Sequence, residues 1–104
     1  MNDLRFLSAL EEIISARIEE DADASYTARL AQRGVLKVAQ KVGEEGVELA
    51  LAAAAQDEGR VTAEAADLLY HLLVLLRLRN LSLGAVVGEL ERRHAAAPAT
   101  DGSD

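Results

Sequence analysis

The sequence has no cysteine, no tryptophan and a single proline among its 104 residues. Without cysteine the chain has no disulfide, no zinc–thiolate site and no cysteine nucleophile. Its aromatic residues are limited to two Tyr and one Phe, whereas alanine and leucine are abundant. Strands favour aromatic and β-branched residues and helices favour Ala and Leu, so this composition predicts an all-α fold.

Basic charge and long apolar runs are also scarce. The formal net charge of −7 argues against a general nucleic-acid-binding protein, which needs basic surface to neutralise phosphates. The longest apolar run, Leu68 to Leu76, contains His71 and is shorter than the roughly 20 residues that a membrane-spanning helix needs. The first residues lack the basic start and apolar stretch of a secretory signal. We therefore expect a cytoplasmic protein that binds neither membrane nor nucleic acid.

Apolar periodicity and capping residues divide the chain into four or five helices. We expect them at about 3–20, from Ser25 to Gly34, at about 35–55, from Thr62 to near Asn80, and from Ser82 to about His94. Residues 1–94 then form one all-α domain. Residues 95–104 are small and polar and include Pro98, which predicts a disordered tail.

The fourth predicted helix is apolar on nearly every side, because leucine fills most positions from Leu68 to Leu78. Such a helix must be covered all round. A lone chain of a few short helices buries too little surface to do so. We therefore expect a homodimer with this helix at its centre.

Two acidic pairs stand out, Glu45 with Glu48 and Glu64 with Asp67. Residues three apart share one face of a helix, and two antiparallel helices joined near Gly59 would bring the pairs together. Four carboxylates at one point need a cation, and oxygen ligands favour Mg²⁺ or Mn²⁺. Because such ions bind phosphate oxygens, the pattern indicates a phosphate-bearing substrate.

A solvated surface is the competing interpretation. On the first acidic helix, a single polar sector is formed by Lys37, Gln40, Lys41, Glu44, Glu45 and Glu48. On the second, Asp67 and His71 share a side with Val74, within an otherwise apolar face. Since carboxylates are rarely buried unless paired or bound to something, this strip favours a site.

The remaining polar residues have two interpretations each. His71 follows Asp67 by four residues and can hydrogen-bond to it, although a lone His near leucine is more often structural. Lys37 and Lys41 fit either ion pairs with Glu44 and Glu48 or contacts to substrate phosphates. Arg29 and Arg33 are weaker candidates for the phosphate role.

The acidic spacing resembles the signature of the all-α, MazG-like nucleotide pyrophosphohydrolases. Within that superfamily, the segments starting at Ser25-Tyr26-Thr27, at Gln40-Lys41-Val42-Gly43-Glu44-Glu45 and at Ala66-Asp67-Leu68-Leu69-Tyr70-His71 are similar to the phosphoribosyl-ATP pyrophosphohydrolase family. The resemblance covers about Phe6 to His94. It departs at Gly46, where the family usually has Ala.

The resemblance implies Mg²⁺-dependent hydrolysis of phosphoribosyl-ATP to phosphoribosyl-AMP and pyrophosphate, the second step of L-histidine biosynthesis, by a stand-alone helical homodimer. It implies metal binding by Glu45, Glu48, Glu64 and Asp67. It makes Glu44 and Glu45 the catalytic candidates, with Glu44 either supporting the metal ligands or acting as the base for the attacking water. Lys37, Lys41 and Arg29 are the substrate-binding candidates, and water is the expected nucleophile. Two alternatives stay open, a housekeeping pyrophosphohydrolase for nucleoside triphosphates and a non-catalytic helical dimerisation module.

Overall fold

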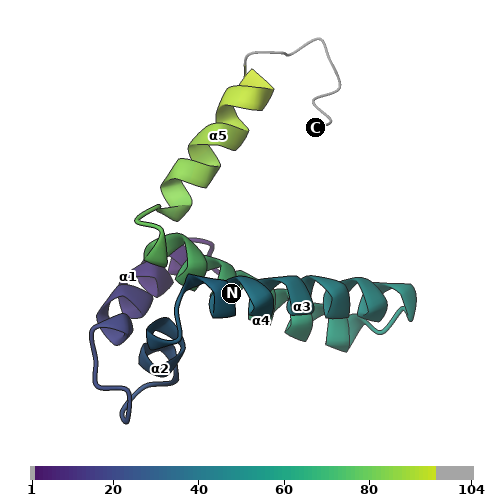
Figure 1. Cartoon of the computed structure of the whole chain (residues 1–104). Helices are drawn as coiled ribbons and strands as arrows, with labels where there is room; N and C mark the ends of the chain where they lie inside the picture. The colour runs from purple at the N-terminus through teal and green to yellow at the C-terminus, as the bar shows by residue number, and fades with distance from the viewer. Residues whose placement is uncertain (1, 96–104) are drawn as a thin grey trace.

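The computed structural model describes residues 2–95, which form five α-helices and no strand. In chain order these are α1 (Phe6–Ile18), α2 (Tyr26–Gln32), α3 (Val35–Ala54), α4 (Glu58–Leu78) and α5 (Leu83–Ala95) (Figure 1). The predicted all-α fold is confirmed. Within the described range, no helix is long and apolar enough to span a membrane. The tail predicted at 95–104 lies outside that range, except for Ala95, which ends α5.

Local capping sets most helix starts. The Ser25 side chain accepts a hydrogen bond of 3.1 Å from the Ala28 amide, as predicted, and Gly34 separates α2 from α3 at a φ of 94°. The prediction of a cap at Thr62 was wrong. Asp57 caps α4 by accepting from the Arg60 amide, so Thr62 lies inside the helix, where its hydroxyl donates to the Glu58 carbonyl.

An antiparallel hairpin of α3 and α4 forms the body of the molecule (Figure 1). Its turn covers residues 55–57, where Gln56 adopts a left-handed φ of 59°. Helices α1 and α2 pack against one end of this hairpin. The core lies at that end and is built from Ile14, Leu30, Val38, Leu73 and Val74. The other end of the hairpin is covered by neither α1 nor α2.

Helix α5 projects away from the other four helices (Figure 1). Leu83, at its start, packs against the core, but no residue of α5 is buried. Its apolar residues Val86, Val87 and Leu90 are exposed. The fold is therefore four packed helices with a fifth that the single chain leaves uncovered.

Candidate active site

The register of the α3–α4 hairpin sets the two acidic pairs at the same distance from its turn. The turn at 55–57 places Glu48 across from Glu64 and Glu45 across from Asp67. A hydrogen bond between Glu45 of α3 and His71 of α4, 26 positions apart in the chain, fixes this register. The two acidic pairs therefore lie on the two antiparallel helices of one hairpin, as the sequence predicts, while the convergence of their four carboxylates stays a prediction.

The four side chains, however, differ in their surroundings. Glu45 is only 8% exposed, whereas Glu48 and Asp67 are exposed. Glu64 is half-buried, with an oxygen 3.7 Å from the Arg60 guanidinium. Glu45, which the sequence groups with a polar sector of its helix, is therefore buried, and Asp67, which the sequence groups with an apolar face, is exposed. Asp67 is exposed although His71, four residues further along α4, is buried.

Among residues 2–95, no three histidine or acidic side chains converge closely enough to hold a metal ion. The donor chemistry nevertheless suits a hard divalent cation, since all four candidate ligands are carboxylates. Exposed Glu48 and Asp67 are free to change rotamer at little cost. A cation would therefore gather these side chains rather than enter a preformed cage.

His71 is the centre of a buried hydrogen-bond network. Its Nδ1 lies 2.6 Å from Glu45 Oε1 and 3.1 Å from the Asp67 backbone carbonyl. Both atoms are acceptors, so Nδ1 carries a proton. In the neutral ring Nε2 then accepts from the Tyr26 hydroxyl, 2.8 Å away. The bond that sequence suggested to the Asp67 side chain is made instead to its backbone, and to Glu45.

This network holds Glu45 in one orientation. His71 of α4 contacts Glu45 of α3 and Tyr26 of α2, so one imidazole ties three helices together. Oε2 of Glu45 accepts no hydrogen bond from the described residues, and no buried side-chain oxygen among them lacks a partner. Oε2 is therefore accessible from the surface while Oε1 is held. Such an arrangement presents one carboxylate oxygen to a ligand in a fixed direction.

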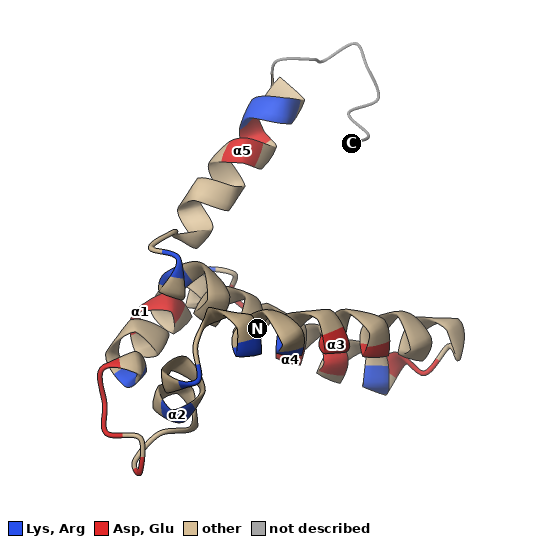
Figure 2. Cartoon of the chain, in the orientation of Figure 1, with Lys and Arg blue, Asp and Glu red and all other residues tan. Residues whose placement is uncertain are grey.

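A basic groove extends along α2 and α3 as far as Glu44, the residue before Glu45. This pocket of about 390 Å³ is lined by Tyr26, Arg29, Leu30, Arg33, Lys37, Gln40, Lys41 and Glu44. Figure 2 shows the positive charge of α2 and the first turns of α3 giving way to negative charge further along the hairpin. The basic groove therefore ends where the acidic residues begin.

Among the four cations of the basic groove, Arg29 donates a hydrogen bond of 2.9 Å to the Ala22 carbonyl. Within residues 2–95, none of them forms a salt bridge. Glu44 accepts instead from the Gln40 amide at 2.8 Å, so the intrahelical ion pairs considered for Lys37 and Lys41 do not form. Arg33 was ranked low from sequence but lines the groove with Arg29. Arg33 follows Arg29 by four residues, which puts both on one helix face, and this spacing was the signal that could have made Arg33 a stronger candidate.

The sequence is similar to known proteins over most of its length. Residues 7–94 match the family described as phosphoribosyl-ATP pyrophosphohydrolase. The chain is 60% identical over 87 residues to a phosphoribosyl-ATP pyrophosphatase of Pyrobaculum islandicum, covering 84% of this chain and 93% of that protein. It is also 52% identical over 94 residues to the histidine biosynthesis bifunctional protein HisIE of Campylobacter jejuni, covering 90% of this chain but 45% of that protein.

Proposed function

The chain belongs to the phosphoribosyl-ATP pyrophosphohydrolase family, and from this we propose that it hydrolyses phosphoribosyl-ATP to phosphoribosyl-AMP and pyrophosphate in histidine biosynthesis. The observation that carries the proposal is the basic groove, which is lined by four cations that form no salt bridge within residues 2–95 and which reaches Glu44, the residue before Glu45. Cations and carboxylates side by side suit a metal-assisted attack on a polyphosphate.

The basic groove is proposed to hold the triphosphate. Lys37 and Lys41 lie one turn apart on α3, and Arg29 of α2 and Arg33, which caps the end of α2, line the same pocket. Charge-assisted hydrogen bonds from such groups to phosphate oxygens are about twice as strong as neutral ones. As the phosphoanhydride breaks, these cations balance the charge that develops on the leaving pyrophosphate.

We propose Glu45, Glu48, Glu64 and Asp67 as the residues that hold Mg²⁺, with Mn²⁺ as a substitute. When bound, such an ion withdraws charge from phosphate oxygens and lowers the pKa of a coordinated water. Glu44 is exposed at the end of the groove and is the candidate to take the proton of the attacking water. Direct attack by water predicts that no phosphoryl-enzyme or nucleotidyl-enzyme can be trapped.

The decisive experiment measures pyrophosphate release from phosphoribosyl-ATP with Mg²⁺ and with excess EDTA. We expect release by the wild-type protein to require Mg²⁺. Asp67→Asn should lower kcat/KM roughly a hundredfold or more, beyond the 10–100-fold typical of residues that only support a ligand. Because Asp67 is exposed, the variant should keep its thermal midpoint. Asp23→Asn, an exposed acid outside the hairpin, is the matched control and should retain full activity.

Two results would redirect the proposal. Release from dCTP and dUTP but not from phosphoribosyl-ATP would move the protein to the housekeeping pyrophosphohydrolases. No release from any of these substrates by folded protein, with Asp67→Asn unchanged in Mg²⁺ binding, would leave only a helical dimerisation module.

We also propose that the protein is a homodimer that acts in the cytoplasm. The leucines of α4, predicted to lie at the centre of the dimer, are partly covered within the single chain. The largest exposed apolar side chains of the hairpin lie on α3 instead, where Leu36 is 87%, Val47 60% and Leu51 61% exposed. A second copy seated on this face would cover them.

A glycine on the same face supports this arrangement. Gly43 lies between Leu36 and Val47 on one side of α3. It costs roughly 1 kcal/mol relative to Ala inside a helix. No atom of the rest of the chain lies within 4 Å of where a Cβ would stand. Close packing inside the chain therefore does not explain Gly43, whereas the approach of a partner helix would.

A further inference from the structure

A second pocket lies on the other side of Tyr26 from the basic groove. This Arg17 pocket has a volume of about 370 Å³ and is lined by Arg17 and Glu20 of α1, by residues 24–27 and by Tyr70 of α4. Tyr26 lines both pockets. Both volumes fall in the range of small-ligand sites, and a ligand longer than one pocket can reach the other past Tyr26.

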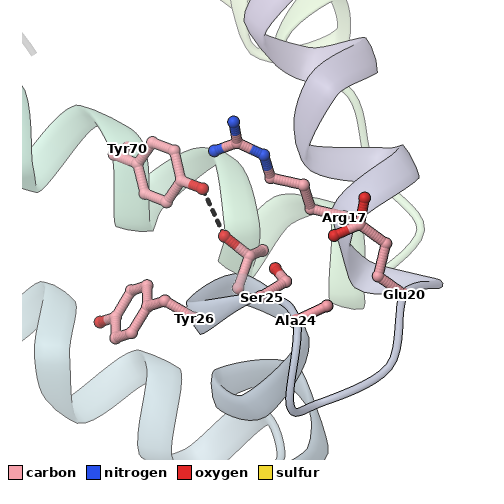
Figure 3. A pocket seen from close by; sticks show the side chains of 7 residues that line it. Arg17, Glu20, Ala24, Ser25, Tyr26 and Tyr70 are labelled. Atoms are coloured by element: carbon pink, nitrogen blue, oxygen red, sulfur yellow. Dashed lines mark hydrogen bonds between the residues drawn. The ribbon is translucent and has the colours of Figure 1, made fainter.

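The polar groups of the Arg17 pocket match a sugar phosphate. Figure 3 shows Arg17 reaching from α1 toward the Tyr70 hydroxyl. Arg17 forms no salt bridge within residues 2–95, so its guanidinium is available to a phosphate. Glu20, also at the pocket, is exposed and can accept hydrogen bonds from sugar hydroxyls.

The wall behind Arg17 is rigid. The Tyr70 hydroxyl and the Thr27 hydroxyl hydrogen-bond to each other, and Thr27 is fully buried. This contact joins α4 to the start of α2, next to the Ser25 cap. A ligand in the pocket therefore meets a fixed surface and two flexible charged side chains.

The charges of the two pockets differ in the way that the two ends of phosphoribosyl-ATP differ. One end of that molecule is a triphosphate and the other is a ribose with a single phosphate, with the purine between them. The basic groove has four cations, whereas the Arg17 pocket has one cation and one carboxylate. Tyr26 stands between the pockets, 45% exposed, and its ring points away from Arg17 (Figure 3).

We propose that the Arg17 pocket binds the phosphoribosyl group of the substrate, with Arg17 on the phosphate and Glu20 on the ribose hydroxyls. The purine then lies against Tyr26 and the triphosphate lies in the basic groove. This assignment rests on the proposed function and deepens it. It makes Arg17 a residue that separates phosphoribosyl-ATP from ordinary nucleoside triphosphates, which fill the groove alone.

Steady-state kinetics of Arg17→Gln test the assignment. We expect the KM for phosphoribosyl-ATP to rise roughly tenfold to a hundredfold, as for the loss of a hydrogen bond to a charged group, with kcat changed less than twofold. Arg17 lies away from the phosphates that react, so binding is affected rather than the chemical step. Arg5→Gln, at the other end of α1, is the matched control and should keep the wild-type KM. An unchanged KM in Arg17→Gln overturns the assignment.

A binding measurement separates this inference from the proposed reaction. Ribose 5-phosphate is titrated into the isotope-labelled protein, and amide shifts are followed by NMR, with inorganic phosphate as the comparison. We expect saturable shifts at residues 25–27 and 70 with ribose 5-phosphate, and their loss in Arg17→Gln. Shifts confined to residues 29–41, or equal effects of the two ligands, overturn the inference. Failure to hydrolyse phosphoribosyl-ATP overturns the proposed function, whichever NMR result is obtained.

Discussion

Glu45 is buried, whereas the acidic residue next to it in the sequence is exposed. Glu44 is exposed and Glu45 is buried, because successive positions on a helix turn by about 100°. Burying a carboxylate is costly unless it is hydrogen-bonded, and His71 supplies the bond. The result is a carboxylate with one oxygen held and one oxygen presented, which suits a metal ligand.

Two substitutions at His71 test whether its hydrogen bond holds Glu45 ready for a metal ion. The Asn amide nitrogen reaches the position of Nδ1 and can still donate to Glu45, whereas the Gln nitrogen reaches toward the position of Nε2 and keeps only the Tyr26 contact. We expect His71→Gln to bind Mn²⁺ roughly 10–100-fold more weakly than wild type, as is typical when the partner of a ligand is lost. His71→Asn should bind it nearly as well as wild type.

The measurement is the Mn²⁺ dissociation constant of each variant, obtained by electron paramagnetic resonance. Val74→Ala, one turn further along α4 and fully buried, controls for loss of stability without touching Glu45. Equal affinities in the Asn and Gln variants would contradict the role assigned to Nδ1.

At the scale of the elements, two serine caps with the same local geometry have different consequences. Ser25 and Ser82 each accept a bond of 3.1 Å from the amide three residues on, Ala28 and Ala85. Ser25 is buried and begins a helix that packs against α1, α3 and α4. Ser82 is exposed and precedes α5, which has no buried residue. One cap is coupled to the core and the other is not.

We therefore expect Ser25→Ala to lower the free energy of unfolding by about 1–2 kcal/mol, the upper range for loss of a helix cap. Ser82→Ala should fray the first turn of α5 and leave global unfolding nearly unchanged. Urea denaturation measures the first effect, and amide hydrogen exchange across α5 measures the second. Equal losses of global stability would show that α5 is coupled to the core more tightly than its contacts indicate.

At the scale of the whole molecule, two apolar surfaces within residues 2–95 are left uncovered by the single chain. One is the face of α3 that carries Leu36 and Val47, and the other is the side of α5 that carries Val86 and Leu90. A contiguous exposed apolar patch marks an interaction site in small proteins. The proposed homodimer would cover this surface without any further partner.

Sedimentation equilibrium tests the homodimer. We expect the wild-type protein to sediment at twice the 11.1 kDa mass of the chain, and Val47→Glu to shift it to the single mass because a charge would be buried in the interface. Leu4→Glu, which adds the same charge at an exposed apolar position before α1, should remain dimeric. A monomeric wild type at micromolar concentration would remove the dimer from the proposal.

The number of helices and the acidic spacing could be predicted from the sequence because both depend on local information. Apolar residues repeat at three and four positions, Ser25 supplies a cap, and two acidic pairs have helical spacing. The prediction of a cap at Thr62 failed because Asp57, five residues earlier, is also a capping residue type. Only the folded helix shows that the Asp57 side chain accepts from a free amide and that Thr62 lies inside the helix.

The sequence by itself determined the all-α class, the hairpin of acidic helices and the family, since composition, periodicity and motif spacing are properties of the chain. Only the tertiary structure decided which carboxylate is buried, because burial depends on how α4 is rotated against α3 and where α1 and α2 end. The same holds for the His71 network, for Arg33 in the basic groove and for the Arg17 pocket. Each joins residues from more than one helix, and contacts between helices arise from packing rather than from local pattern.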